Sequence, residues 1–190
     1  MMKALLLDGT LKNDFDMIRS SIIEKLEKKG FEVDSILLRE TKVAACQGCF
    51  DCWVKTPGEC KIDDYGRDVA RKMVQSNLII HYTPITFGGY SSEMKKVLDR
   101  FIPTILPFFT KREGETHHKY RYEKRSSIIS VGVLDEPNEE KKSTFKELVF
   151  RNSLNMGAPV HEAIIYTKNQ NKNDFINQFS KILKKVEGKI

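Results

Sequence analysis

Short apolar runs alternate with helical patterns along the whole of this 190-residue chain. Strand-like runs are expected at residues 3–8, 31–38, 78–82, 128–133 and 160–167. Apolar residues at steps of three and four predict helices at residues 13–29, 64–75, 91–101, 138–155 and 174–186. Such a succession of β–α units calls for a parallel sheet with helices on both faces, which is an α/β three-layer sandwich.

The domain organisation follows from the same pattern. No repeat, low-complexity tract or Pro/Gly-rich linker divides the sequence, so a single domain is predicted over residues 1–190. It carries a cysteine-rich loop at about 41–63 and a loop insertion at about 108–125. In parallel α/β folds, ligands bind beyond the carboxyl ends of the strands. The segments expected there are 9–13, the cysteine-rich loop, 83–91 and 134–138.

Composition narrows the class of protein. Hydrophobic residues make up 40% of the chain and charged residues 31%, which is the balance of a globular protein in water. The amino-terminal apolar run is too short for a secretory signal, and no stretch reaches membrane-spanning length. We expect a cytoplasmic protein with no membrane contact. The net charge of +6 is modest, and the basic stretch 119–125 lacks a nucleic-acid-binding motif, so it indicates a solvated face or a subunit contact.

All four cysteines of the chain fall within residues 46–60, at Cys46, Cys49, Cys52 and Cys60. This compact spacing can turn several thiolates toward one point, as a metal ion or an iron–sulfur cluster requires. Three interpretations stay open: a 4Fe–4S cluster, a structural zinc site, and metal-free cysteines that pack or form a redox pair. Zinc is disfavoured because the usual paired arrangement at opposite ends of a loop is absent.

The loop after the first strand is a candidate anion site. Its backbone N–H groups, the Thr10 hydroxyl and the start of the following helix could hold a phosphate, and Lys12 adds charge. The segment matches neither the dinucleotide-binding nor the P-loop pattern. The alternative is an ordinary strand-to-helix turn, capped by Asn13 or Asp14.

The loop after the third strand, residues 83–91, combines glycines with aromatic residues. Gly88 and Gly89 allow backbone to approach a flat ligand closely, and Phe87 and Tyr90 offer ring faces to it. The alternative is a glycine turn that packs both aromatic side chains into the core.

Three segments together resemble the NAD(P)H-dependent FMN reductase and iron–sulfur flavoprotein group of the flavodoxin-like superfamily. They are Cys46 through Cys60 to Asp63-Asp64, then Thr83 to Ser91, then Met94-Lys95 to Asp99-Arg100. The resemblance implies a flavodoxin-like three-layer sandwich whose five-stranded parallel sheet has the order 2-1-3-4-5. It also implies a homodimer or a higher homo-oligomer.

The resemblance further implies the cofactors and their sites. The phosphate of FMN would lie at Thr10, Leu11, Lys12 and Asn13, and its ring would lie against Pro84, Ile85, Thr86, Phe87, Gly88, Gly89 and Tyr90. The four cysteines would bind a 4Fe–4S cluster beside the flavin. A nicotinamide dinucleotide, NADH or NADPH, would be the substrate, and the electron partner would be free flavin, a quinone or a ferredoxin-like protein.

The chain departs from the family pattern at the phosphate loop, which is shorter and poorer in Ser, Thr, Arg and Asn than usual. Asp14 and Asp16 lie near the helix start, where they would repel a phosphate if aimed at it. We therefore expect either weaker FMN binding or carboxylates that face away from the site.

The remaining polar residues have simpler interpretations. His117 and His118 are expected in a loop over the flavin, with a solvated loop as the alternative, and His81 is expected to be a satisfied structural histidine at a strand end. Asp99 and Arg100 are interpreted as a local ion pair.

The leading hypothesis is an FMN-containing oxidoreductase that accepts a hydride from NAD(P)H, with no catalytic side chain named. One alternative is an iron–sulfur flavodoxin-type electron carrier without nicotinamide activity. The other is a flavin-free interaction module on the same fold.

Overall fold

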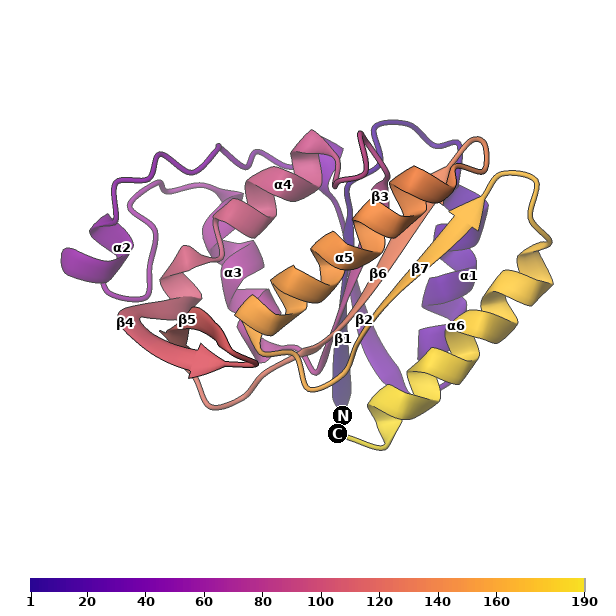
Figure 1. Cartoon of the computed structure of the whole chain (residues 1–190). Coiled ribbons are helices and arrows are strands. Elements are labelled where there is room, and N and C mark those ends of the chain that lie inside the picture. The colour runs from indigo at the N-terminus through magenta and orange to yellow at the C-terminus, as the bar shows by residue number, and fades with distance from the viewer. Residues whose placement is uncertain (190) are drawn as a thin grey trace.

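A parallel sheet of five strands runs through the centre of the computed structural model, which describes residues 1–189 (Figure 1). Its strands are β1 (Met2–Asp8), β2 (Phe31–Leu37), β3 (Leu78–Pro84), β6 (Ser127–Leu134) and β7 (His161–Thr167). Each of these strands overlaps a strand that the sequence pattern predicts, and every neighbouring pair is parallel. The predicted α/β class with a parallel sheet is confirmed.

The predicted strand order 2-1-3-4-5 requires a correction, because the order along the sheet is β2-β1-β3-β6-β7. Two further strands, β4 (Ile105–Arg112) and β5 (Glu115–Tyr120), pair antiparallel in a separate hairpin. This hairpin occupies the segment where a loop was expected. Its tight turn uses Glu113 and Gly114, both with positive φ, and Glu-Gly is not one of the dipeptides that announce such a turn.

Helices cover both faces of the sheet. One face is covered by α1 (Asp16–Glu27) and α6 (Lys172–Glu187), and the other by α3 (Tyr65–Gln75), α4 (Ser92–Asp99) and α5 (Glu139–Met156) (Figure 1). Shorter helical turns are α2 (Asp51–Val54), η1 (Leu38–Glu40) and η2 (Ile102–Thr104). The expected cap of α1 at Asn13 or Asp14 is wrong, since the helix begins after Phe15, which makes no side-chain capping bond.

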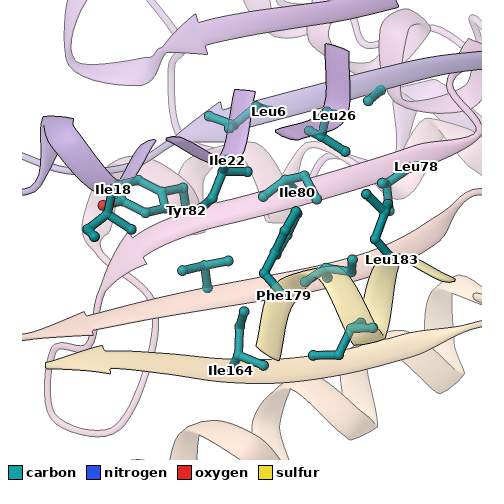
Figure 2. Close-up of a cluster of buried hydrophobic side chains, with 14 of the residues drawn as sticks. Leu6, Ile18, Ile22, Leu26, Leu78, Ile80, Tyr82, Ile164, Phe179 and Leu183 are labelled. Carbon is teal, nitrogen blue, oxygen red and sulfur yellow. The ribbon is translucent and has the colours of Figure 1, made fainter. Parts of the chain in front are cut away.

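The first core lies between the sheet and the pair α1 and α6 (Figure 2). Leu6 of β1 meets Ile22 of α1, while Phe179 and Leu183 of α6 cover the strands beyond; all four are fully buried. Burying each such side chain contributes about 1.5–3 kcal/mol. The apolar face of α6 therefore holds that helix to the sheet.

The second core lies on the opposite face, because successive strand residues point to opposite sides. Leu5 and Leu7 of β1 pack there with Met73 of α3, Met94 of α4 and Phe145 of α5. Burial on both faces explains why β1 is an unbroken apolar run and not an alternating one. Among residues 1–189, no helix combines the length and apolar character needed to cross a membrane.

Candidate functional site

The loops after β1 and β3 meet at the carboxyl edge of the sheet. These two strands are neighbours, and the Ser91 hydroxyl donates to the Gly9 carbonyl oxygen at 2.6 Å. A Cβ atom at Gly9 would lie 2.6 Å from Ser91 Oγ, so only glycine permits this approach. Ser91 also accepts from the backbone N–H of Met94 and so caps α4. The two segments with predicted cofactor contacts are thus joined directly.

A buried carboxylate organises the loop after β1. Asp8 is 0% exposed, and its Oδ1 accepts from both the backbone N–H and the hydroxyl of Thr10, at 2.8 and 2.6 Å. Oδ2 lies 3.4 Å from Arg19 Nε and 4.0 Å from the guanidinium of Arg39. Burial raises the pKa of Asp8 above its ordinary value, although the Thr10 bonds and both arginines act to lower it. Thr10 is buried, whereas Leu11, Lys12 and Asn13 are exposed.

Arg39 contacts this loop from outside it, and the sequence analysis missed it. Its Nη1 donates to Thr10 Oγ1 at 3.1 Å, and its Nη2 donates to Asn13 Oδ1 at 2.5 Å. The residue lies just beyond β2, which is paired with β1. That position, a cation at the carboxyl end of the neighbouring strand, is the signal that could have identified it.

The loop after β3 is a tight turn. Thr86 and Gly89 exchange backbone hydrogen bonds at 3.0 and 2.8 Å, and the two residues between them, Phe87 and Gly88, have φ of 50° and 80°. Gly88 is required twice over, since a Cβ there would also lie 2.7 Å from Thr144 Cγ2 of α5. The turn is therefore fixed by both backbone geometry and packing on α5.

The two aromatic residues of this turn behave differently. Phe87 is 95% exposed, whereas Tyr90 is 9% exposed and packs edge-on against His81 and Phe145. Phe87 is exposed, as expected for a ring that offers its face to a ligand, and Tyr90 is buried, as expected for a ring that packs into the core. Of the other predicted ring contacts, Ile85 is buried and Thr86 is exposed.

His81 lies within β3, not at its end, and is buried. Burial lowers its pKa to about 4, so the ring stays neutral near pH 7. Its Nδ1 lies 3.1 Å from Ser130 Oγ, while Nε2 has no hydrogen-bond partner within residues 1–189. The expectation of a satisfied structural histidine is therefore met at one ring nitrogen only.

The four cysteines line one cavity of about 50 Å³. Cys52 is buried, Cys60 is half-buried, and Cys46 and Cys49 are exposed. Burial raises the pKa of the Cys52 thiol, and the charges of the other three thiolates raise it further. The thiolate of Cys49 in turn raises the pKa of Lys61. The loop thus gathers all four thiols and sets a cation beside them.

The disposition of these thiols distinguishes two kinds of metal group. Within the described part of the chain, no group of three or more His, Cys, Asp or Glu side chains is disposed to hold a metal ion. Zinc would draw its sulfur ligands to about 2.3 Å from one point, so the arrangement does not fit zinc. In an iron–sulfur cluster each thiolate binds its own iron, and four thiols spread around one cavity fit that donor set.

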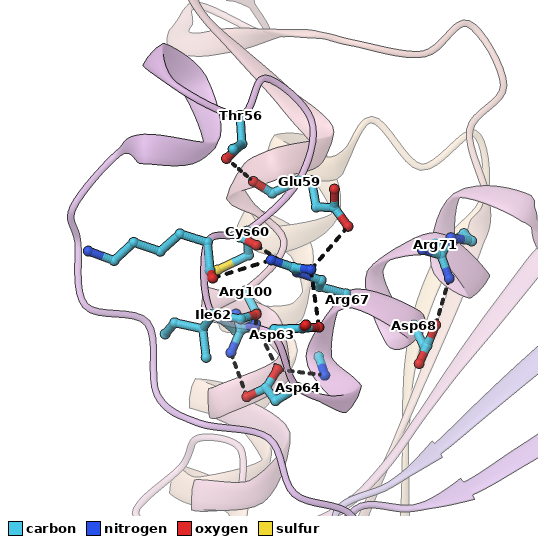
Figure 3. Close-up of polar contacts among 12 residues, drawn as sticks. Thr56, Glu59, Cys60, Ile62, Asp63, Asp64, Arg67, Asp68, Arg71 and Arg100 are labelled. Atoms are coloured by element: carbon cyan, nitrogen blue, oxygen red, sulfur yellow. Dashed lines mark hydrogen bonds and ion pairs between the residues drawn. The ribbon is translucent and has the colours of Figure 1, made fainter.

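A buried ion pair closes the base of the cysteine loop (Figure 3). Arg100, 2% exposed, donates to Asp64 Oδ1 at 2.8 Å and also to the carbonyls of Ala44 and Ile62, at 3.0 and 3.2 Å. Asp64 accepts from the backbone N–H groups of Ala44 and Gly66. Both ends of the loop are thereby fixed to the end of α4. The predicted Asp99–Arg100 pair is wrong.

The partners of Arg100 have consequences for neighbouring groups. Asp99 pairs instead with Lys95, one helical turn earlier. Burial raises the pKa of Asp64, but hydrogen bonds from Arg100 and two backbone amides outweigh this and hold it below its ordinary value. Arg67 supports the same region, since its Nε donates to the Cys60 carbonyl at 2.8 Å (Figure 3).

The hairpin β4–β5 packs against the cysteine loop through aromatic rings. Trp53 stacks on Phe50, with centroids 5.0 Å apart, and contacts His118 at 4.8 Å; His118 contacts Phe109 at 4.7 Å. The indole N–H donates to the carbonyls of Ile102 and Ile105. Trp53 therefore anchors the loop.

The adjacent histidines of the hairpin have different partners. His117 Nε2 lies 3.1 Å from Glu115 Oε2, whereas His118 faces the rings of Trp53 and Phe109. They belong to strand β5, not to a loop.

The parallel sheet, its order and the loops at its carboxyl edge define a flavodoxin-like α/β protein. The sequence pattern of the family described as NADPH-dependent FMN reductase matches residues 2–129, and the chain belongs to this family. The family is one of flavin-dependent oxidoreductases.

Relatives and solved structures agree with this membership. An iron–sulfur flavoprotein of Methanocaldococcus jannaschii is 31% identical over 86 residues, 45% of this chain and 44% of that protein. An iron–sulfur flavoprotein of Archaeoglobus fulgidus is 31% identical over 81 residues, 43% of this chain and 36% of that protein. The matches thus cover less than half of each relative's length.

Among solved structures, similarity extends over nearly the whole fold. An NADH:FMN oxidoreductase in its apo form has a TM-score of 0.67 at 10% identity, covering 100% of this chain and 90% of that one. An NAD(P)H:quinone oxidoreductase from Methanothermobacter marburgensis has a TM-score of 0.67 at 11% identity, covering 93% and 94%. At such identities the likeness concerns the fold.

Proposed function

We propose that the protein is an FMN-binding oxidoreductase that accepts a hydride from NADH or NADPH and passes the electrons to a flavin, quinone or electron-carrier acceptor. The observation that carries the proposal is the direct junction of the loops after β1 and β3, through Ser91 and Gly9. The family membership supports FMN as the cofactor. The names of structurally similar proteins support nicotinamide donors and quinone acceptors.

The loop residues have separate roles in this proposal. The loop from Thr10 to Asn13 lies at the phosphate end of the site, and Pro84 to Tyr90 form the ring end. Phe87 offers an open aromatic face, while Ile85 and Tyr90 are buried and support the turn from below. FMN, when bound, supplies a group that accepts a hydride and can release electrons singly. The chain's own contribution is to bind and orient that group.

A spectroscopic titration tests the proposal. Protein purified without oxygen is mixed with FMN, freed of excess flavin and treated with NADPH or NADH. We expect a bound flavin band that bleaches on addition of one of the two nucleotides. The variant Phe108→Ala, which removes an exposed aromatic ring from the hairpin and leaves both loops untouched, should behave as the unmodified protein does in this titration. Absence of bound flavin, even with FMN in excess, contradicts the proposal and favours a flavin-free module.

We further propose that Cys46, Cys49, Cys52 and Cys60 bind a 4Fe–4S cluster. The shared cavity and the nearby Lys61 support an anionic cluster there. The names of the matched relatives support it independently. Iron and sulfide analysis of protein handled without oxygen should give about four of each per chain. Iron well below one atom per chain would instead favour metal-free cysteines.

A second candidate function is electron transfer without nicotinamide activity, favoured by the iron–sulfur flavoprotein names of the relatives. It predicts that reduced ferredoxin bleaches the flavin band while NADH and NADPH do not. Oligomeric state is part of the same proposal: we expect a homodimer or a higher homo-oligomer, which sedimentation analysis would reveal.

A further inference from the structure

The loop after β1 has a charge problem if it is to hold a phosphate. The phosphate of FMN carries a charge near −2 at neutral pH, and the loop and helix start already carry Asp8, Asp14 and Asp16. Lys12 is the loop's own cation, and it is exposed. Like charges at close range cost on the order of 1 kcal/mol or more near a surface. A dianion can therefore bind well only if another part of the fold brings a cation to the loop.

Arg39 brings that cation. It lies in η1, directly after β2, and its side chain is 18% exposed. One edge of the guanidinium donates to Thr10 Oγ1 and to Asn13 Oδ1. A guanidinium has five N–H donors in a planar fork, which suits bidentate phosphate binding. The bonds to the loop orient that fork without using all of its donors.

Asp8 holds this arrangement from behind. Its Oδ2 has no hydrogen-bond partner within the described residues and lies 3.4 Å from Arg19 and 4.0 Å from Arg39. The Thr10 hydroxyl donates its only proton to Asp8 and accepts from Arg39. Thr10 therefore aligns Arg39 and has no proton left for a phosphate. Glu40, 3.9 Å from Arg39, is exposed and lies on the solvent side.

The backbone of the loop adds donors of its own. The N–H groups of residues 11–14 make no hydrogen bond within residues 1–189, and they precede α1, whose N-terminus is its positive end. A solvent-open hollow of about 420 Å³ is lined by Arg39 and Leu11, together with the charged residues Lys42, Glu93 and Lys96. Arg39 and the first residue of the loop with a free amide can thus be reached from the same hollow.

We propose that Arg39 is the principal phosphate-binding side chain of the flavin site, held in position by Asp8 through Thr10. This inference rests on the proposed FMN function. It assigns to a residue outside the loop the charge that the shortened, acidic loop lacks. The side chain binds the phosphate group of the cofactor, so its effect is confined to ligands that carry that group.

Riboflavin, which is FMN without its phosphate, provides the test. Dissociation constants for FMN and riboflavin are measured by flavin fluorescence with wild type, Arg39→Gln and Arg39→Lys. We expect wild type to prefer FMN, and Arg39→Gln to weaken FMN binding about 10- to 100-fold while riboflavin binding changes less than about threefold. Arg39→Lys should fall between, because it keeps the charge and loses the fork.

Arg71→Gln is the matched control. It removes the same guanidinium group at an exposed position of α3, where Arg71 pairs with Asp68 away from the loop after β1, so it should leave both constants nearly unchanged. Thermal unfolding of each variant checks that the fold is intact.

The outcomes separate the two proposals. Equal loss of FMN and riboflavin in Arg39→Gln, or an FMN preference that survives the substitution, overturns the role of Arg39 while the flavin function stands. Equal affinity of wild type for both ligands also overturns it. If wild type binds neither ligand, the FMN function itself fails and the role of Arg39 fails with it.

Discussion

Phe87 is an aromatic residue that the fold keeps in solvent at a cost. It is 95% exposed, and its φ of 50° lies in the left-handed region that non-glycine residues seldom adopt. Such strain is of order 1–3 kcal/mol and is retained mostly where it serves a ligand or a switch. Nothing in the packing of the turn needs the ring, so a ligand-facing role is the simplest reason for it.

Replacing Phe87 with alanine should weaken FMN and riboflavin binding equally, by about tenfold, because the ring contact is shared by both ligands. Phe87→Gly should have the same effect on binding and should also raise the free energy of unfolding by about 1 kcal/mol, since glycine tolerates positive φ. Fluorescence titration and urea unfolding measure the two effects. Unchanged riboflavin affinity in both variants would remove Phe87 from the site.

Asp64 makes the stability of the protein depend on pH. Its folded-state pKa is lowered, mainly by the hydrogen bond from Arg100 against the opposing effect of burial. A group of this kind stabilises the fold above its unfolded pKa, close to the ordinary value of 3.8, and the contribution is lost as pH falls through the folded pKa. The native protein should therefore lose stability below about pH 4.

Asp64→Asn should flatten this acid dependence, and at pH 7 it should lower the free energy of unfolding by about 3 kcal/mol, because Arg100 is left buried without its partner. Urea unfolding at several pH values measures both effects. Asp68→Asn is the control, since Asp68 pairs with Arg71 on the exposed side of helix α3. An acid slope that persists in Asp64→Asn would assign it to other carboxylates.

At the scale of elements, the hairpin β4–β5 and the cysteine loop depend on one indole group. Trp53 donates to two carbonyls near the start of the hairpin, stacks on Phe50 and makes a tilted contact with the ring of His118. The loop has little other regular structure besides the short helix α2. Its local stability should therefore respond strongly to changes at Trp53.

Trp53→Phe keeps an aromatic ring and removes the N–H donor. The loss of that hydrogen bonding should cost about 1 kcal/mol locally, which corresponds to about a fivefold larger open population. Trypsin cleavage after the exposed Lys55 should accelerate by the same factor. His118→Phe, which preserves the ring contact, should cleave nearly as the native protein does. Equal rates in all three proteins would show that the loop is held by other contacts.

At the scale of the whole molecule, the two cores on opposite faces of the sheet are both apolar but differ in their relation to the candidate site. The core under α1 and α6 contains no residue of the candidate site, whereas the other core includes Ile85 and Tyr90, which belong to that site. Substitutions in the first core should act on stability alone.

Phe179→Ala in α6 should lower the free energy of unfolding by about 3–5 kcal/mol, because it opens a cavity at a fully buried position. The fluorescence of Trp53, which lies in the cysteine loop, should be unchanged in the folded state. A shifted emission in the folded state would mean that the two sides of the sheet are more strongly coupled than their separate cores suggest.

The main elements of this fold are readable from sequence because parallel strands buried on both faces appear as short apolar runs between amphipathic helices. The hairpin β4–β5 is not readable in this way, because its turn residues, Glu113 and Gly114, are not typical and the sequence of β5, Glu-Thr-His-His-Lys-Tyr, is mostly polar. Because the hairpin adds two strands to the chain before the last two strands of the sheet, those strands are β6 and β7 and not the fourth and fifth.

The candidate site was only partly predictable. The cysteine spacing and the glycine turn are local patterns, so residues 46–60 and 83–91 could be selected from sequence. Arg39 and the Arg100–Asp64 pair are long-range contacts, 29 and 36 residues apart from their partners. No local pattern encodes such pairings. The exposure of Phe87 and the burial of Tyr90 likewise depend on which side of the turn α5 covers.

The closed base of the cysteine loop makes that loop a detachable appendage. Since Arg100 and Asp64 tie residue 44 to residues 62–64 through carboxylate, amide and carbonyl groups, the stretch between can be exchanged for a short glycine–serine bridge. Such a graft would yield a sulfur-free counterpart with the same sheet, in which Arg100 loses the neighbouring Cys60 thiol and the start of the hairpin loses the indole donor of Trp53.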